Sequence, residues 1–584
     1  MDTQTVYRST VSQIVGRERE IRLIVAALGA GRDLLLEGPP GTSKSTILRT
    51  ITIAERVPLY FVEGNADLTP AKLIGQHSPS RVLQEDYGPQ SFTYGPLPLA
   101  MREGGFLYIE EFNRVPEDTL NTLLTAMAGL STAYATNSPV LCIAGQIQSD
   151  LIGRGRGVLH EIPNQLTAVR SVTKWAAQAL DPTEVPDLVA TAFRELATGR
   201  PRPVEIEIPP DILQRTAPVT LPDVAVAART AGDPDLLEMA ARALGQAERP
   251  LIFVGGGVLQ AGAWAELQTL AELLEAPVVM SSSGKGALSS RHYLAQTMIA
   301  AGSLLPSSDV VLVVGTRFTQ PPSASWGPTK DQTVIQLDAD MEEIGRNYPP
   351  SIGIVADAKL GLAELADRVG KHNRVRASRE DELRALQAKV DDLLFEIQPQ
   401  ASYALALREE LPDDGILVGE MTQVGYWANQ GYPVYEPRTY ITPGYQGTLG
   451  FGFPTALGAQ VGNPTKRVVS INGDGGFLYN VQELATAAMH GINVVAVVFN
   501  DNAFGNVKRI QKDTFGGHYL GSDLLNPDFM RLAEAFGIAG IRANGPEGLR
   551  AALREAFDAV GPVLIEVPVD EMPSMWSVLS RALR

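Results

Sequence analysis

The sequence predicts an α/β protein in which a P-loop fragment is followed by doubly wound parallel-sheet domains. Short apolar runs of strand length alternate with helical patterns along most of its 584 residues, a pattern typical of parallel sheets. Several runs end at glycines, as at Gly255–Gly257 and Gly473–Gly476. A further glycine-rich turn, residues 38–45, joins a strand to a helix. Because parallel strands end at one sheet edge, we expect the functional loops to gather there.

The composition narrows the class of protein. The net charge is −17, which argues against nucleic acid or an anionic membrane as the main partner. The one cysteine, Cys142, lies in an apolar run, and we expect a buried, inert thiol rather than a disulfide. The first ten residues lack the basic and apolar regions of a signal peptide, and no run has transmembrane length. We therefore expect a cytoplasmic protein.

The first part of the chain carries a nucleotide-binding pattern. Residues 33–37 (DLLLE) predict a short buried strand, and residues 38–45 read GPPGTSKS before a predicted helix. This resembles the P-loop, whose backbone N–H groups hold phosphates while Lys44 reaches the terminal ones and Ser45 holds Mg²⁺. Ser43 stands where the motif's second glycine is common. The predicted nucleotide-binding residues here are Gly38, Gly41, Thr42, Ser43, Lys44 and Ser45.

A second apolar run, Phe106–Ile109, ends in Glu110-Glu111. Together with residues 14–18 (IVGRE) and the P-loop, it resembles the AAA+ family, specifically MoxR-type ATPases. The resemblance implies that Glu110 is the Walker B acid, which is normally Asp, and that Glu111 is the catalytic glutamate. After a predicted helix at residues 117–127 the AAA+ pattern stops, and no sensor strand, arginine finger or helical lid follows. We place the junction near Gly129 and expect incomplete ATP hydrolysis.

The next segments alternate strands and helices. A helix at 182–196 and a strand at Val204–Ile208, ended by two prolines, precede a Pro/Ala-rich linker at 213–232. Further strands are predicted at 251–254, 310–314 and 334–337, in a doubly wound parallel sheet. Arg154 and Arg156 could hold an anion or simply lie in a solvated glycine loop, and His160-Glu161 favours a structural role. Residues 374–398 predict a charged helical linker.

The clearest unit in the chain is a βαβ pattern at residues 468–507. Strands are predicted at 468–471 and 494–499, with a helix between them at 479–490. That helix has Asn480 as its cap, Glu483 as capping-box partner and Gly491 as its end. The right-handed crossover places the loops carrying Asp474 and Asp501 at one sheet edge. Glycines beside Asp474 let N–H groups approach an anion, and oxygen ligands near a phosphate suit Mg²⁺. The unit therefore predicts a metal and diphosphate site.

This unit resembles the thiamine diphosphate motif, GDG followed after a helix by NN or ND, of acetolactate synthase-type enzymes. The resemblance covers about 130–570. It implies that Asp474, Asp501 and the Ala503 carbonyl bind the metal; many relatives have Asn at the position of Asp501. The Gly447 carbonyl would accept from the cofactor's amino group, and Leu449 would bend the cofactor into a V shape. The predicted cofactor-binding residues are Thr422, Gln423, Gly447, Leu449, Gly473, Asp474, Gly475, Gly476, Asp501 and Ala503.

The resemblance also implies an organisation into five segments. These are a partial MoxR-type module at 1–128, a partial pyrimidine-binding domain at 129–212, a central Rossmann-like domain at 233–370, a thiamine diphosphate-binding domain at 400–570 and a tail at 571–584. The central domain binds FAD only in some family members, and its pattern here makes FAD unexpected. The family's active sites form between subunits, which implies a homodimer or homotetramer.

The implied activity is decarboxylation of a 2-oxo acid such as pyruvate, followed by carboligation, with thiamine diphosphate and Mg²⁺. The family's cofactor-activating glutamate lies early in the first domain, and nothing in residues 1–128 matches it; Glu63 belongs to the ATPase-like part. Three hypotheses follow. The protein is a carboligase whose glutamate comes from elsewhere, an ATP-binding regulator with a C-terminal scaffold, or a fusion that only binds cofactors.

Overall fold

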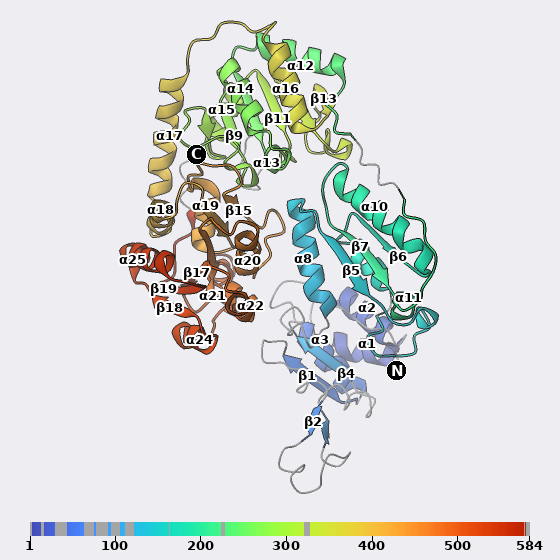
Figure 1. Cartoon of the computed structure of the whole chain (residues 1–584). Helices are drawn as coiled ribbons and strands as arrows, with labels where there is room; N and C mark the ends of the chain where they lie inside the picture. Colours follow the sequence, from blue (N-terminus) through green and yellow to red (C-terminus); the bar gives the residue numbers. More distant parts are fainter. Residues whose placement is uncertain are drawn as a thin grey trace. The chain divides into compact units, whose positions relative to one another are not determined.

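The computed structural model describes residues 3–12, 14, 17–29, 44–55, 57–63, 75–77, 92–94, 106–110, 122–162, 164–222, 228–319, 327–576 and 579. The chain divides into two compact units, Met1–Gly129 and Leu130–Arg584 (Figure 1). Each is described separately below. The α/β class with parallel sheets is confirmed. Across the described residues, no helix combines the length and the apolar character needed to cross a membrane.

The first unit contains helices and two small sheets. Its helices are α1 (Thr3–Val11), α2 (Glu18–Gly29) and α3 (Lys44–Glu55). Strands β1 (Leu59–Glu63) and β4 (Phe106–Glu110) pair in parallel, while β2 (Gly75–His77) and β3 (Phe92–Tyr94) pair antiparallel. Ile21 and Ile51 are fully buried between the helices. The predicted strand at 33–37 lies outside the described residues.

Helix α8 (Thr122–Thr136) runs across the division between the two units. The sequence predicted that this helix would end at Met127, and this end was wrong. The residues that follow Met127, AGLSTAYAT, contain no proline and are mostly good or neutral helix formers, so the single Gly129 does not end the helix. The helix therefore continues until Asn137, which takes a positive φ of 54°, a conformation that ends helices.

The second unit begins with a half-sheet of three parallel strands, ordered β5-β7-β6. They are β5 (Leu141–Gly145), β6 (Trp175–Gln178) and β7 (Val204–Ile208), and the accompanying helices are α9 (Gln165–Arg170), α10 (Val185–Ala197) and α11 (Pro210–Leu213). Val204, Ile206 and Ile208 form a small core against α10. Cys142 is only partly buried, so the prediction of a buried thiol was wrong. Strand β5 lies at the edge of the sheet, which leaves the thiol partly open.

The central domain is a six-stranded parallel sheet, ordered β10-β9-β8-β11-β12-β13. Its strands are β8 (Pro250–Val254), β9 (Val278–Met280), β10 (Ala295–Gln296), β11 (Val310–Val314), β12 (Thr333–Asp338) and β13 (Ile352–Val355). Its helices are α12 (Pro234–Gln246), α13 (Gly256–Ala261), α14 (Trp264–Leu274), α15 (Ala301–Leu304) and α16 (Ala358–Val369). The sequence predicted three of these strands from apolar runs. These runs are buried on both faces, as parallel sheets require.

The C-terminal domain is a second six-stranded parallel sheet, ordered β15-β14-β16-β17-β19-β18. Its strands are β14 (Ile416–Gly419), β15 (Tyr440–Ile441), β16 (Val468–Gly473), β17 (Val494–Asn500), β18 (Ala539–Arg542) and β19 (Val563–Pro568). Its helices are α18 (Gln400–Glu410), α19 (Gln423–Gly431), α20 (Gly452–Gly462), α21 (Asp474–Phe477), α22 (Glu483–His490), α23 (Gly505–Thr514), α24 (Phe529–Ala535) and α25 (Gly545–Asp558). Helix α17 (Glu380–Phe395) precedes this domain, and one hydrophobic core joins it to both sheets.

The helix predicted at 479–490 forms in a different way. The chain turns first through the short helix α21, then through a single 3₁₀ turn, and α22 begins at Glu483. Asn480 does not cap the helix, because its side-chain amide donates to the Gly450 carbonyl at 2.8 Å. The predicted end is confirmed: Gly491 has a φ of 57° and its N–H bonds back to Ala487 and Ala488.

Candidate functional site

The two aspartates predicted to bind a metal lie at the carboxyl ends of neighbouring strands. Asp474 follows β16 and Asp501 follows β17, and these strands pair in parallel with Gly473 opposite Phe499. Asp474 is buried, with an exposed fraction of 2%. Its carboxylate accepts from the Gly475 N–H at 2.9 Å and from the Asn526 amide at 2.6 Å. The parallel pairing therefore brings together two acids that are 27 residues apart in the sequence, as predicted for this sheet edge.

The electrostatics of this pair favour a cation. Burial, together with the charge of the neighbouring Asp474, raises the pKa of Asp501 to about 6. Burial also raises the pKa of Asp474, against the effect of the Asn526 amide and nearby backbone N–H groups. Two carboxylates that each disfavour the charge of the other are stabilised when a divalent cation lies between them. The Ala503 residue is buried beside them, and its N–H donates to Asp501 at 3.2 Å.

A hydrogen-bonded chain of side chains holds these acids from behind. Asn526 donates both to Asp474 and to the Asn500 side-chain oxygen, the latter at 2.8 Å. Asn500 in turn donates to Glu566 at 2.8 Å, and Arg542 donates to the other Glu566 oxygen at 2.8 Å. Sequence reasoning missed this chain. Asn500 and Glu566 could have been found as polar residues at the ends of buried strands, whereas Asn526 lies in a loop with no such signal.

The other predicted cofactor residues surround the same edge. Thr422 is the residue before α19, and its side chain lies against Gly473, where an added Cβ would meet it at 3.6 Å. Gln423 begins the helix. Gly475 leaves no room for a Cβ against Phe504. The glycines therefore permit a close approach of chain segments at this turn.

The glycine-rich loop 447–452 carries the remaining predicted positions. Gly447 and Gly450 have φ values of 59° and 79°, which L side chains rarely adopt. Leu449 is 39% exposed, so its side chain projects from the loop rather than packing in the core. The Thr448 hydroxyl hydrogen-bonds with that of Thr132 at 2.8 Å. These features agree with a loop shaped to face a ligand.

One buried acid at this edge has no role in the sequence prediction. Glu420, at the end of β14, is 2% exposed and accepts from the Gly450 N–H. Burial raises the pKa of its carboxyl to about 8, although the Gly450 and Gly452 N–H groups act in the opposite direction. The sequence offered a signal, because an acid that directly follows a buried apolar run at a sheet edge is unusual.

The predicted ATP site is largely outside the described residues. This applies to Gly38, Gly41, Thr42, Ser43 and Glu111. Lys44 and Ser45 form the first turn of α3, and Glu110 is the last residue of β4. A Lys-Ser pair at a helix start and an acid at a strand end are the backbone placements that the motif requires. Their side chains are not described.

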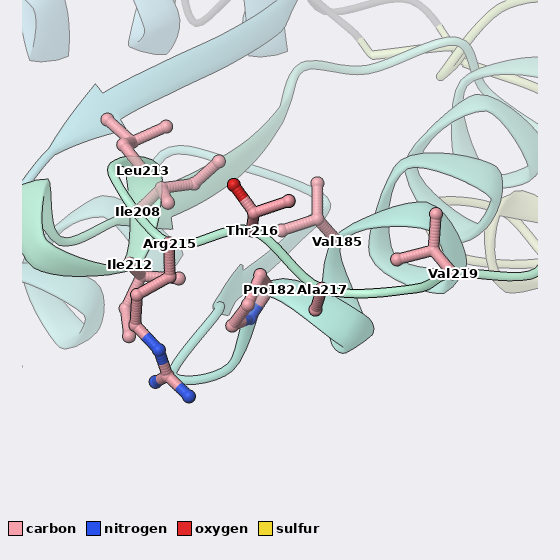
Figure 2. Close-up of a pocket in the computed structure, with 9 residues that line it drawn as sticks. All are labelled: Pro182, Val185, Ile208, Ile212, Leu213, Arg215, Thr216, Ala217 and Val219. Atoms are coloured by element: carbon pink, nitrogen blue, oxygen red, sulfur yellow. The ribbon is translucent and has the colours of Figure 1, made fainter.

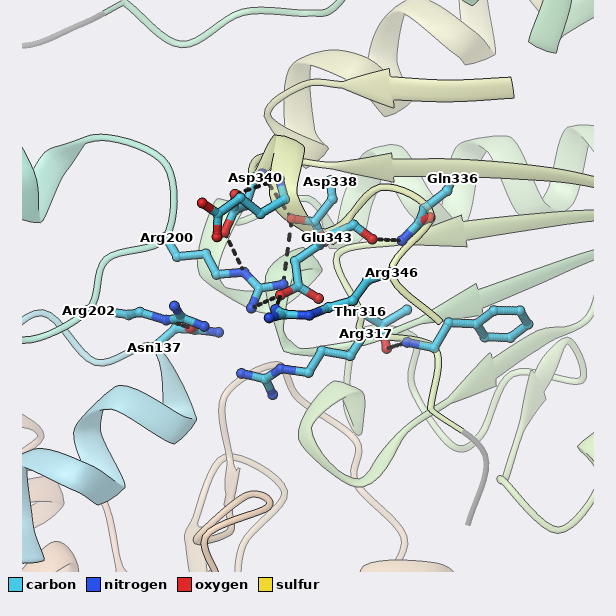
Figure 3. A network of polar contacts seen from close by, with 12 residues as sticks. Asn137, Arg200, Arg202, Thr316, Arg317, Gln336, Asp338, Asp340, Glu343 and Arg346 are labelled. Atoms are coloured by element: carbon cyan, nitrogen blue, oxygen red, sulfur yellow. Dashed lines mark hydrogen bonds and ion pairs between the residues drawn. The ribbon is translucent and has the colours of Figure 1, made fainter. Parts of the chain in front are cut away.

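The half-sheet segment is joined to the central domain by a group of ion pairs. Arg200, 8% exposed, forms ion pairs with Asp338 (4.0 Å), Asp340 (3.5 Å) and Glu343 (2.9 Å) of the central domain (Figure 3). Burial raises the pKa of Asp338 to about 6, while Arg200 lowers it. The network thus fixes the half-sheet segment against the central domain.

The other candidates of the half-sheet, Arg154, Arg156 and the pair His160-Glu161, stay predictions. Arg154 and Arg156 lie in an exposed glycine loop. Glu161 accepts from the backbone N–H groups of Arg156 and Val158. These bonds support the predicted structural role of the pair His160-Glu161. An open hollow of about 340 Å³ lies where α11 and the following residues meet Pro182 and Val185 (Figure 2). Its lining is mostly aliphatic, and it contains none of the predicted site residues.

With this geometry established, comparisons with known proteins identify the class. The central domain of thiamine pyrophosphate enzymes matches residues 237–365, and their C-terminal TPP-binding domain matches residues 420–567. An AAA domain of the dynein-related subfamily matches residues 33–129. The chain belongs to the thiamine pyrophosphate enzyme family, with an AAA domain at its N-terminal end. Both predicted resemblances are confirmed at this level, and the MoxR subtype stays a prediction.

Curated relatives define the branch of the family. A probable acetolactate synthase large subunit of Methanocaldococcus jannaschii is 33% identical over 477 residues, which cover 76% of this chain and 79% of that protein. A probable 2-ketoarginine decarboxylase of Pseudomonas aeruginosa is 33% identical over 450 residues, covering 75% and 79%. Acetolactate synthase isozyme 3 large subunit of Escherichia coli is 32% identical over 474 residues, covering 76% and 81%. The chain is thus similar to acetolactate synthases and to a decarboxylase.

Proposed function

We propose that this protein binds thiamine diphosphate with Mg²⁺ at the edge of the C-terminal sheet and decarboxylates a 2-oxo acid such as pyruvate, with carboligation of the product. The observation that carries the proposal is the pairing of the buried Asp474 with the half-buried Asp501 at adjacent strand ends, each with a raised pKa. Asp474, Asp501 and the Ala503 carbonyl would hold the metal, and oxygen ligands beside a phosphate are what Mg²⁺ prefers.

The chain's own residues perform the binding and orientation. The Gly473–Gly476 turn and the start of α19 at Thr422 and Gln423 would bind the diphosphate through backbone N–H groups. Gly447 would accept from the amino group of the cofactor, and Leu449 would hold its two rings at an angle. Thiamine diphosphate supplies the electron sink on which loss of carbon dioxide depends. The similarity to acetolactate synthases and to a decarboxylase supports this reaction class.

The test combines binding and turnover on the same sample. Calorimetry with thiamine diphosphate and Mg²⁺ should show tight binding, and EDTA should abolish it. Asp474→Ala should weaken binding by at least about 100-fold, because a metal carboxylate is lost. Asp558→Ala, an exposed acid at the end of α25, should bind as the parent protein does. Equal affinity of the parent and Asp474→Ala would refute the proposed site.

Pyruvate consumption then separates the remaining hypotheses. Turnover would show that a cofactor-activating glutamate reaches the site. Binding without turnover would show a cofactor-holding protein that lacks this group. We expect a homodimer or homotetramer, since family sites form between subunits, and sedimentation measures this directly. A cytoplasmic location and the absence of FAD stay predictions, which fractionation and the absorbance spectrum of the purified protein can test.

A second candidate function is ATP binding at the N-terminal unit. It is favoured by the AAA match at residues 33–129 and by Lys44-Ser45 at the first turn of α3. ATP binding with Mg²⁺ should be lost in Lys44→Ala, while thiamine diphosphate binding stays unchanged. Hydrolysis above the level of the Lys44→Ala variant would contradict our expectation that the AAA module is incomplete.

A further inference from the structure

Glu420 lies where three segments of the proposed cofactor site meet. It follows β14, its carboxyl accepts from the Gly450 N–H of the glycine-rich loop, and that same oxygen leaves no room for a Cβ on Gly476 in the 473–476 turn. Gly452 is also closely packed, because an added Cβ would clash with the Asn472 side-chain oxygen and lie 3.1 Å from the Glu420 Cβ. This one side chain thus contacts the glycine-rich loop and the turn that carries Asp474 from its own position between β14 and Thr422.

The surroundings of Glu420 do not suit a carboxylate anion. The side chain is 2% exposed, and its second oxygen, Oε2, has no hydrogen-bond partner among the described residues. The Asn472 side-chain oxygen has no partner there either, and a Cβ on Gly452 would come close to both oxygens. Two buried acceptors that converge on one small space without a donor are unfavourable. A proton on Oε2 would remove the charge and supply a donor.

Among the described residues, no cation is found to offset a charge on Glu420. The groups that act on the Glu420 carboxyl are burial and the N–H groups of Gly450 and Gly452. Burial raises the pKa of the Tyr426 phenol on α19; Arg509 lowers it, and the charge of Glu420 is a smaller cause that raises it. Asn472, on β16, is neutral and donates to Ser470 and to the Val497 carbonyl.

We propose that Glu420 is a positioning residue, held as a neutral carboxylic acid, which couples the glycine-rich loop to the 473–476 turn so that both can hold the cofactor. The expected effect of Glu420 on cofactor affinity rests on the proposed function, the binding of thiamine diphosphate at this edge. A neutral acid here also avoids a third buried negative charge at an edge that must accept the diphosphate anion beside Asp474 and Asp501. An anionic Glu420 would repel the diphosphate. It would also leave its Oε2 and the Asn472 side-chain oxygen close together without a hydrogen between them.

The first experiment compares Glu420→Gln with the parent protein. Glutamine is neutral at every pH, accepts from Gly450 as the acid does and carries a donor for the second position. At pH 7 its affinity for thiamine diphosphate with Mg²⁺ should stay within about threefold of the parent. Above about pH 8 the parent should weaken by about tenfold per pH unit relative to Glu420→Gln, because only the protonated acid is competent. Identical pH profiles, or a loss beyond tenfold at pH 7, would overturn the proposal.

Two controls separate this role from general stability. Glu205→Gln removes another buried acid with a pKa raised to about 8, in the half-sheet; its cofactor affinity should follow the parent at every pH. The second control needs no cofactor: hydrogen exchange at the Gly450 N–H should be equally slow in the parent and Glu420→Gln at pH 7. It should speed up at least about tenfold in Glu420→Ala, which lacks the acceptor.

The exchange measurement also distinguishes the two proposals. If the parent protein binds no thiamine diphosphate at any pH, the proposed function fails, and exchange at Gly450 still decides the role of Glu420. Fast exchange in Glu420→Gln at pH 7 would show that the anion is required, which contradicts a neutral acid. If Glu420→Ala does not fold, Glu420→Asp serves instead, since its shorter side chain cannot reach Gly450 in the same way and should show the faster exchange.

Discussion

The half-sheet and the end of the C-terminal sheet are built alike. In the first, β7 lies between β5 and β6; in the second, β19 lies between β17 and β18, all in parallel. Glu207 and Glu566 take equivalent positions in the central strands. Gln146 and Gln178 donate to Glu207 at 3.3 and 2.9 Å, as Asn500 and Arg542 donate to Glu566.

The two regions differ in what surrounds this shared frame. In the C-terminal sheet, β14, β15 and β16 continue the sheet beyond β17, and both faces carry a hydrophobic core. The half-sheet ends at β5, and the core described for it lies on the α10 side. Aligned through the two glutamates, the buried Val497 corresponds to Ile143, which is 64% exposed, and the buried Leu564 corresponds to Glu205.

The comparison shows which part of the frame carries the proposed chemistry. Strand order and the buried glutamate are common to both regions, so they belong to the architecture. The metal-binding acids, the glycine-rich loop and Glu420 depend on β14 and β16, and the half-sheet has no described counterpart of these strands. The relatives are covered over only about four fifths of their length, and the AAA match ends at residue 129, where the half-sheet unit begins.

The largest expected effect concerns the residue that links the shared frame to the proposed metal site. Asn500→Ala should weaken thiamine diphosphate and Mg²⁺ binding by about 10- to 100-fold, because Asn526 and Glu566 both lose their partner behind Asp474. Gln146→Ala, at the equivalent position of the half-sheet, should leave the affinity unchanged. Calorimetry on the two variants measures this, and equal losses would mean that the positions do not differ in function.

The next largest effect is a loss of stability expected at Val497, which is buried in β17 where the corresponding Ile143 of β5 is exposed. Val497→Ala removes two buried methyl groups and should lower the free energy of unfolding of the C-terminal domain by about 2 kcal/mol. Chemical denaturation followed by tryptophan fluorescence measures the shift, since Trp427 is buried in the same domain. A change below about 0.5 kcal/mol would show that β17 is less tightly packed than its burial indicates.

A smaller change in the free energy of unfolding is expected for a substitution at Glu205 in the half-sheet, and it is stabilising where Val497→Ala is destabilising. Neither oxygen of the buried Glu205 carboxyl has a hydrogen-bond partner among the described residues, and burial raises its pKa to about 8. The folded state therefore binds the proton more tightly than the unfolded state, so stability falls as pH rises from about 4.5 to 8. Glu205→Leu, which copies Leu564, should remove this slope and stabilise the protein by about 1 kcal/mol or more at pH 8. Thermal unfolding between pH 5 and 9 tests it, and a lower melting temperature at pH 8 would contradict it.

The smallest effect is expected at the edge strand. Ile143→Ala changes an exposed side chain and should alter the free energy of unfolding by less than about 0.5 kcal/mol. It should nevertheless reduce concentration-dependent association, because an edge strand with exposed apolar residues can pair with other chains. Light scattering at several concentrations detects this. Unchanged scattering would show that β5 is covered in solution.

Much of this fold follows from local patterns. Buried runs such as Val310–Val314 and the glycine end of α22 could be predicted because parallel strands and left-handed helix ends restrict the residue types strongly. The positions of Asp474 and Asp501 followed from the crossover rule. Helix starts were predicted less well, since the Asn480 side chain bonds to the distant Gly450 carbonyl instead of its own helix.

The remaining parts depend on contacts distant in sequence. Nothing near Asn526 indicates that it reaches Asp474 across 52 residues, and nothing near Glu420 indicates that it meets Gly450. Short β-strands such as β10 pair through two residues and leave no periodic pattern. Local sequence therefore predicts which strand ends carry ligands, whereas the residues that support them are fixed by tertiary structure.

The Arg200 ion pairs should make the joint between the half-sheet segment and the central domain sensitive to pH. Three carboxylates from the central domain converge on this one guanidinium, and burial raises the pKa of Asp338 to about 6. Because burial in this joint favours the protonated form of Asp338, the closed joint binds that proton more tightly than an opened joint would, and the joint weakens as the pH rises from about 4 to about 6. The half-sheet segment should therefore resist a protease better at pH 5 than at pH 7, while cleavage of the C-terminal sheet should not depend on this group.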